Sequence, residues 1–138
     1  MEITIDDSIC RSQETRERIL SAALHLFSKN GFHASTTRAI SRVADVNEVT
    51  LFRLFNNKSE LFRSVLNRAK KIQFDLKPIE EIRSIPEKVI QYIAVKTLEV
   101  MEDHPKEFRL MHYAIVDEVE EFEDEFIKDF QSKIQLYL

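Results

Sequence analysis

Apolar side chains recur at steps of three and four residues along most of this 138-residue chain, which is the spacing of one face of an α-helix. One glycine, three prolines and 43% hydrophobic residues leave little material for the turns of a many-stranded sheet. The pattern therefore predicts an all-α fold. The expected helices cover about residues 13–30, 37–44, 48–55, 58–74, 79–82 and 86–103, followed by one from Pro105 and a last one near Val119.

The stretch from Thr36 to Phe55 contains two short helical patterns separated by a break of three residues, 45–47. Thr36 and Asn47 each precede a pattern and are expected to be N-caps, because their side-chain oxygens can accept from unpaired backbone N–H groups. Two helices joined by so short a turn cross steeply, and the second is narrow enough for the major groove of DNA. This is a candidate helix-turn-helix. Its expected inward residues are Ile40, Val43, Ala44, Val49, Leu51, Phe52 and Phe55.

The segment before this motif divides into a tail and a helix. Residues 1–12 have no sustained hydrophobic period and are expected to form a flexible tail, which contains the single cysteine, Cys10. A first helix is expected from about Gln13 to Asn30. Gly31 follows at once, where a left-handed C-terminal cap is favoured.

The segment after the motif predicts further helices with wider apolar surfaces. In a fourth helix, residues 58–74, the expected buried stripe includes Leu61 and Val65. Pro86 suits the first position of the next helix, with Ser84 nearby as a cap. That helix runs to Asp103 and is apolar over so much of its circumference that a central, buried position is expected. The helix from Pro105 is expected to share one face among Phe108, Met111, His112, Ile115 and Val116.

These patterns give four expected domains: a tail (1–12), a helix-turn-helix domain (13–57), a connecting helix (58–74) and a helical regulatory domain (75–138). In the last pattern, Val119, Phe122, Phe126, Phe130 and Ile134 recur at helical steps up to Leu138 without a cap. The regulatory domain is therefore expected to be C-terminally incomplete.

Charge divides the chain into two halves with opposite signs. Residues 11–71 hold twelve Lys and Arg against five acids, a net charge of +7, whereas residues 72–138 hold eight against sixteen, a net charge of −8. A basic segment around a helix-turn-helix suits a polyanion. The acidic N-terminus, the lone cysteine and the absence of an apolar run of ~20 residues favour a cytoplasmic protein without a membrane contact.

Candidate chemistry outside the motif is sparse. The acidic run 117–125 is interrupted by Val119 and Phe122 and is expected to be a solvated face and not a metal site. No paired carboxylates, nucleophile with base, or phosphate loop occurs at usable spacing, so neither an enzyme nor a cofactor is expected. His112 is typical of a satisfied core histidine, and it is also the best polar candidate for lining a ligand pocket. The expected pocket residues are Met101, Phe108, Met111 and His112.

From Thr15 to Lys71 the chain resembles the DNA-binding domain of the tetracycline-repressor (TetR) family of bacterial transcriptional regulators. The resemblance is carried by ILSAALHLFSKNGF, TTRAIS, the turn ADVN, TLFRLF and KSELF. It implies that Thr37 and Arg38 contact the phosphate backbone, that residues 47–50 face base edges, and that Lys58 contacts phosphate. The full set of expected DNA contacts is Thr36, Thr37, Arg38, Asn47, Glu48, Val49, Thr50, Phe52, Arg53 and Lys58.

The chemistry of three of these side chains supports base contacts independently. Arg53 can donate twice to guanine, Glu48 can accept from the amine of cytosine, and Val49 can pack on a thymine methyl. Departures from the family pattern affect the turn and the phosphate contacts. Asp45 stands where the family usually has glycine, and Phe52 and Leu54 replace common tyrosine or histidine residues.

The resemblance implies a homodimeric repressor that places two recognition helices in successive major grooves, ~34–36 Å apart on a near-palindromic operator. A small, mostly apolar ligand bound among the later helices would release it from DNA. The alternative is a helical protein-interaction module that kept the fold and lost operator recognition, which Phe52 and Leu54 favour. The +7 segment argues against that alternative, and the salt dependence of DNA binding would separate the two hypotheses.

Overall fold

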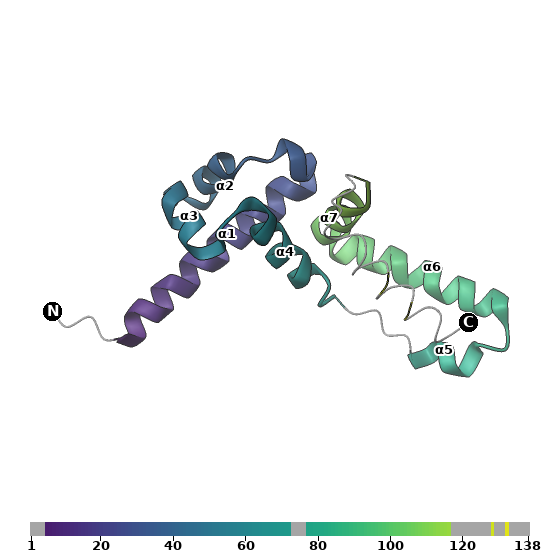
Figure 1. Ribbon diagram of the computed structural model, residues 1–138. Coiled ribbons are helices and arrows are strands. Elements are labelled where there is room, and N and C mark those ends of the chain that lie inside the picture. The colour runs from purple at the N-terminus through teal and green to yellow at the C-terminus, as the bar shows by residue number, and fades with distance from the viewer. Residues whose placement is uncertain (1–4, 73–76, 117–127, 129–131, 133–138) are drawn as a thin grey trace.

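The computed structural model describes residues 5–72, 77–116, 128 and 132, and every element in these ranges is a helix (Figure 1). This confirms the all-α fold. The predicted last helix and the acidic run 117–125 lie outside the described residues, apart from two isolated positions. The helices are α1 (Ile5–Ala34), α2 (Thr37–Ala44), α3 (Glu48–Phe55), α4 (Lys58–Ala69), α5 (Lys77–Ile82), α6 (Pro86–Asp103) and α7 (Pro105–Val116).

The starts of α2, α3 and α4 are fixed by side-chain caps. Thr36 Oγ1 accepts from the backbone N–H of Ala39 at 3.1 Å, and Asn47 Oδ1 accepts from that of Val49 at 3.3 Å. Asn57 Oδ1 likewise accepts from the first turn of α4 at 2.8 Å. Each bond satisfies an N–H group that has no partner within its helix. The predicted caps Thr36 and Asn47 are confirmed, as is the break at 45–47.

Helix α1 is longer than the sequence predicts. It begins at Ile5 and not at Gln13, so the flexible tail predicted for residues 1–12 is wrong for residues 5–12. Adding a turn to an existing helix is easier than nucleating one, and no glycine or proline stops α1 in this direction. Ser8 to Glu14 are exposed, so this part of α1 projects beyond the core (Figure 1).

Gly31 interrupts α1 close to the predicted end. Its φ of 80° lies in the region that favours glycine, but its ψ of 177° is extended and differs from the expected left-handed helical value. One further helical turn then leads to Ala34. The position of the break was predicted correctly, and the conformation was not.

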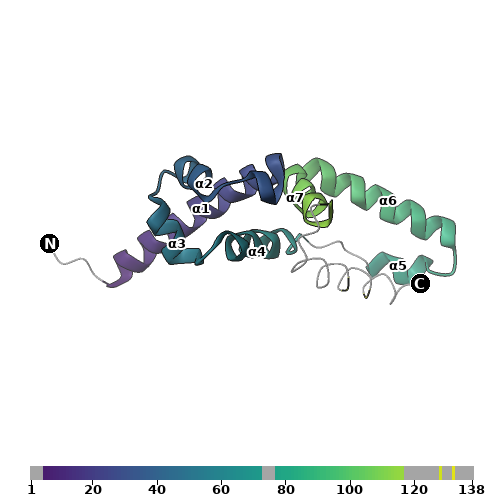
Figure 2. The same ribbon diagram turned by 45° about the horizontal axis from the view of Figure 1, so that its top comes forward.

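The core lies among α1, α2, α3 and α4. Phe62 of α4 packs its ring edge-on against Phe27 at 5.0 Å and Phe32 at 5.1 Å. The predicted buried stripe of α4 is confirmed, although the helix ends at Ala69 and not near residue 74. Leu110 and Ala114 of α7 join the same cluster, because α7 packs against both α1 and α4 (Figure 2).

Helix α6 has the predicted bounds but a different environment. Its first residue is Pro86, and no side chain caps it, so the proposed cap Ser84 is wrong. The predicted central, buried position is also wrong: only Val89 is fully buried, while Ile90 is 67% and Leu98 59% exposed. Among the described helices its main neighbours are α5 and α7, and none of these helices covers the apolar side that carries Ile90 and Leu98.

Helix α7 buries a face different from the predicted one. Leu110 and Ala114 are fully buried. His112 and Val116 of the predicted face are exposed, so the interpretation of His112 as a core residue is wrong. The buried face of α7 is therefore centred on Leu110 and Ala114, and it packs towards α1 and α4.

A search of the described helices for a membrane-spanning segment finds none with the required length and hydropathy.

Candidate nucleic-acid interface

Helix α3 presents one face to the core and the other to solvent. Leu51 and Phe55 are buried, as predicted, whereas Val49 is 72% exposed and Phe52 and Arg53 are also exposed. The inward positions predicted for Val49 and Phe52 are therefore wrong, and Val43 of α2 is exposed as well. The main neighbours of α3 are α2 and α4, and only Leu51 and Phe55 of α3 belong to the core that these helices share.

The first turns of α2 and α3 are joined by a side-chain hydrogen bond. Thr37 Oγ1 donates to Glu48 Oε1 at 3.4 Å, and both residues are half-buried. The bond holds the Glu48 carboxylate in place and leaves its second oxygen available as an acceptor. Thr36 and Arg38, on either side of Thr37, are exposed. These predicted contacts thus lie together where α2 and α3 begin.

Arg18 of α1 closes the other end of α2. Its Nε donates to the carbonyl of Ala44 at 3.1 Å, and its Nη2 donates to the carbonyl of Asp45 at 2.7 Å. These carbonyls belong to the negative end of the α2 dipole, which a cation stabilises. Asp45 has φ 54° and ψ 52°, so it adopts a left-handed conformation, which glycine, the usual residue of the family at this position, adopts without strain. Arg18 therefore fixes the turn that orients α3.

Arg16, two residues before Arg18 on α1, holds the far end of α3. Its guanidinium carbon lies 4.4 Å from the centre of the Phe55 ring, and its Nη1 donates to the carbonyl of Leu54 at 3.3 Å. No role was predicted for Arg16 or Arg18, since their three acceptors are backbone carbonyls of other helices and of the turn after α2. Their positive charge was the only available signal, and it lies within the polar segment 11–18.

Lys58 is turned towards the protein. Its Nζ donates to the carbonyls of Phe32 at 3.0 Å and Ser35 at 3.2 Å, and it lies 4.3 Å from the centre of the Phe32 ring. Burial lowers the pKa of this amine below its usual value. The residue expected to contact phosphate thus anchors the connection between α1 and α2, and one N–H donor is left for any further partner.

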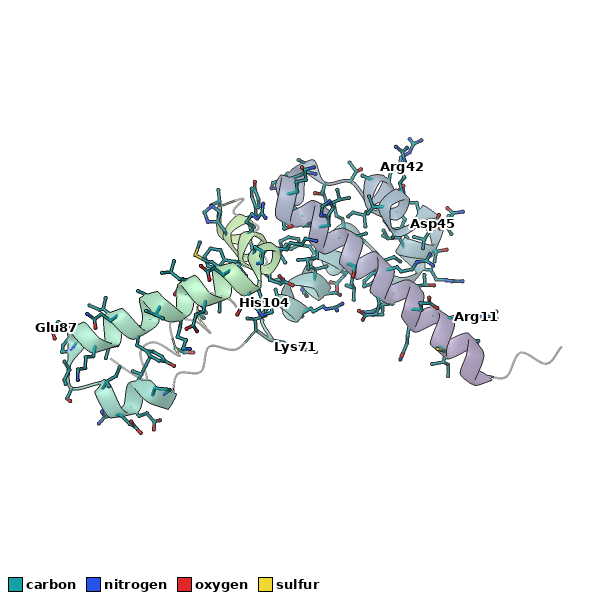
Figure 3. The ribbon with its side chains drawn as sticks, turned by 180° about the vertical axis from the view of Figure 1, so that it is seen from behind. Arg11, Arg42, Asp45, Lys71, Glu87 and His104 are labelled. Atoms are coloured by element: carbon teal, nitrogen blue, oxygen red, sulfur yellow. The ribbon has the colours of Figure 1, made fainter. Side chains whose placement is uncertain are left out.

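The remaining predicted contacts are at the start of α3. Asn47 is exposed and Thr50 is half-buried, on the helix whose main neighbours are α2 and α4. Figure 3 shows Arg42 and Asp45 at the end of the molecule opposite Glu87, the second residue of α6. The face of α2 and α3 is therefore left uncovered by α5 and α6.

The expected ligand-pocket residues do not surround a common cavity in the part of the chain that the structure describes. Met101 and His112 are exposed, and Phe108 and Met111 are half-buried, with Met111 packed against the core. Two surface hollows are defined elsewhere, one between α1 and α2 and one between α1 and α3. Within the described ranges no three His, Cys, Asp or Glu residues group as a metal site would require.

Comparisons with known proteins agree with this geometry. The family model of bacterial regulatory proteins of the tetR family matches residues 19–65. RutR of Escherichia coli, an HTH-type transcriptional regulator, is 32% identical over 120 residues, which are 86% of this chain and 56% of RutR. YvkB of Bacillus subtilis, an uncharacterized HTH-type transcriptional regulator, is 44% identical over 54 residues, which are 39% of this chain and 29% of YvkB.

A solved structure is similar over most of the chain. NalD, described as the secondary repressor of the MexAB-OprM multidrug efflux pump in Pseudomonas aeruginosa, has 25% sequence identity and a TM-score of 0.50. The match covers 75% of this chain and 51% of NalD. The chain thus spans about half the length of RutR and NalD, and its first helices match most specifically.

Proposed function

We propose that the chain, whose residues 19–65 match the family model of bacterial regulatory proteins of the tetR family, is a DNA-binding transcriptional regulator of that family whose α3 lies in the major groove. The observation that carries this proposal is the solvent-exposed side of α3, with Val49 and Arg53 facing away from the core. A helix held at both ends by α1, and open on its outer side, is suited to reading base edges.

Several side chains of this face have suitable partners in DNA. Val49 would pack on a thymine methyl, Arg53 would donate to guanine, and the second oxygen of Glu48 would accept from cytosine. Thr37 and Arg38 would contact the backbone beside the groove, which positions the protein without reading sequence. Lys58 could contact phosphate only through its remaining N–H donor.

We further propose that the intact protein is a homodimeric repressor. Two copies of α3 would enter successive major grooves of a near-palindromic site. NalD, which is described as a repressor, supports this direction of regulation. A small apolar ligand near Met101, Phe108, Met111 and His112 would release DNA by favouring a different position of α7. Since α7 packs on α1 and α4, such a shift would reach the helices that hold α3.

The sharpest test places the same negative charge on two exposed aliphatic positions. Val49→Glu adds a carboxylate to the outer side of α3, and Ile90→Glu adds one to the open side of α6. Fragments of genomic DNA selected by the wild-type chain would be titrated with both variants. We expect Val49→Glu to weaken binding at least about tenfold through repulsion from phosphate and loss of the methyl contact, and Ile90→Glu to have little effect.

Both variants should keep the wild-type helix content, because neither side chain is in the core. The proposal is wrong if the wild-type chain binds no duplex DNA, or if Val49→Glu binds as the wild type does. If only Ile90→Glu loses binding, the open side of α6 and not the outer side of α3 is needed for DNA binding, and the placement of α3 in the major groove is wrong.

A further inference from the structure

A surface hollow lies between the projecting part of α1 and the C-terminal end of α3. It is lined by Ser8, Arg11, Ser12, Thr15, Arg53 and Leu54. The four α1 residues follow one another at steps of three, one and three, so they form a single polar face of that helix. The lining contains two guanidinium groups and three hydroxyl groups, and it contains no carboxylate.

The two arginines of the hollow are available for a ligand. Both Arg11 and Arg53 are exposed, and neither takes part in an ion pair among the side chains of residues 8–72. The Thr15 hydroxyl donates to the carbonyl of Arg11 at 2.8 Å, which stays within the helix and does not involve the guanidinium. Two positive groups around one hollow, with no acid in its lining, attract an anion with several acceptor oxygens, such as phosphate.

The position of Arg11 relative to α3 is defined by its neighbour on α1. Arg16, five residues later, stacks on Phe55 and bonds the carbonyl of Leu54, so α1 is held against the end of α3. Figures 1 and 2 both show the first turns of α1 extending past α3, away from α5 and α6. Figure 3 labels Arg11 on this projecting part. The residue therefore lies beside the proposed recognition helix.

We propose that Arg11 binds a backbone phosphate of duplex DNA next to the base pairs read by α3, with Arg53 on the opposite side of the same hollow. This inference rests on the proposed function and adds a contact from α1 to it. A phosphate contact carries no sequence information, so its contribution should be the same for every duplex. It also adds positive charge to an interface in which Phe52 and Leu54 offer no hydroxyl group.

The test compares Arg11→Ala with Lys29→Ala, an equal change of charge at an exposed position near the other end of α1. Binding of a random-sequence duplex and of a selected genomic fragment is measured by fluorescence anisotropy. Losing one phosphate contact removes about 0.9 from the salt slope for each bound chain, so the ratio of wild-type to Arg11→Ala affinity should fall about threefold per bound chain between about 50 and about 200 mM salt. Both duplexes should show this fall, and Lys29→Ala should show much less.

The possible failures can be told apart. If Arg11→Ala and Lys29→Ala behave alike while the wild type binds DNA, the inference is wrong and the proposed function stands. If Arg11→Ala weakens only the selected fragment, the contact reads bases and the phosphate assignment is overturned. The hollow could also bind a free anion. If Arg11→Ala abolishes the binding of inorganic phosphate but does not change the affinity for DNA, the proposal is also overturned. Absence of any wild-type binding to duplex DNA would overturn both proposals.

Discussion

The helices α1–α4 and the helices α5–α7 are held in position by different kinds of contact. In the first region, Arg16, Arg18 and Lys58 each bond backbone carbonyls that belong to another helix or its flanking turn. In the second region, Lys96 pairs with a residue three positions away, and Arg109 bonds a carbonyl four positions away. Bonds of the first kind fix one helix against another, whereas bonds of the second kind stabilise a single helix.

The two regions also differ in how they bury apolar side chains. Most of the buried cluster lies in α1–α4, whereas α6 buries only Val89 fully and leaves Ile90 and Leu98 to solvent. The link between the regions is α7, whose Leu110 and Ala114 belong to the main cluster. The N-terminal region can therefore present α3 as a rigid part, while the arrangement of α5 and α6 depends on fewer contacts.

Removing a core ring tests this contrast most strongly. Phe62 is fully buried against two other rings, so Phe62→Ala should lower the free energy of unfolding by about 3–5 kcal/mol through loss of apolar burial and the cavity left behind. Leu98→Ala removes an exposed side chain and should change it by no more than about 0.5 kcal/mol. Urea denaturation monitored by circular dichroism would measure both values.

Phe62→Leu serves as the matched control, since it keeps an apolar side chain and should lose less. A large loss of stability in Leu98→Ala would contradict the comparison. It would mean that the open side of α6 is covered in solution, for example by a second copy of the chain. A dependence of that loss on protein concentration would identify such a copy.

The contrast also explains which features could be predicted from sequence. Thr36, Asn47 and the turn at Asp45 were predicted correctly because a cap or a turn depends on residues within a few positions. The proline at the start of α6 was predicted for the same reason. In each of these cases the partner is local, so the sequence contains the whole interaction.

Long-range contacts could not be predicted in this way. The carbonyl partners of Arg16, Arg18 and Lys58 lie 38, 26 and 26 residues away along the chain. The residues next to each arginine or lysine do not specify such a distant partner. The width of the apolar surface of α6 was visible, but burial depends on which helices cover it. Of the inward residues predicted for α3, only Leu51 and Phe55 are buried, because helical spacing alone does not say which side of a helix meets the core.

Lys58 allows a test of a bond that ties the N-terminal region together. Lys58→Met keeps the length of the side chain and removes the donors to the Phe32 and Ser35 carbonyls, so we expect a loss of about 1–2 kcal/mol in the free energy of unfolding. A corresponding exposed lysine, Lys29→Met, should have almost no effect. If both variants lose the same free energy of unfolding, the hydrogen bonds from Lys58 do not stabilise the fold.

The pH dependence of Lys58 follows from its lowered pKa. In the folded chain the amine loses its proton at a lower pH than in the unfolded chain, where its pKa is near 10.5. Between these two values the unfolded state binds more protons, so the free energy of unfolding rises with pH. The stability difference between the wild type and Lys58→Met should therefore widen as pH rises through this window. If the stability difference becomes smaller as pH rises, the inferred lowering of the Lys58 pKa by burial is contradicted.

The smallest expected effect concerns a strained position within the rigid region. Asp45 has a left-handed backbone and carries a negative charge at the negative end of α2. Asp45→Gly removes both penalties, while it gives the unfolded chain more freedom, so we expect a net gain of about 0.5 kcal/mol in the free energy of unfolding. Asp45→Asn keeps a side chain that tolerates this conformation and removes only the charge, and Asp45→Ala removes the charge but keeps the strain.

Chemical denaturation of the three variants at low and high salt separates these causes. If strain dominates, glycine stabilises the fold, alanine destabilises it, and salt has little influence. If charge dominates, all three variants gain stability at low salt and lose that gain as salt screens the α2 dipole. A loss of stability in Asp45→Gly would mean that flexibility at the turn outweighs both terms. The bonds from Arg18 to the Ala44 and Asp45 carbonyls would then be insufficient to hold α3 in place.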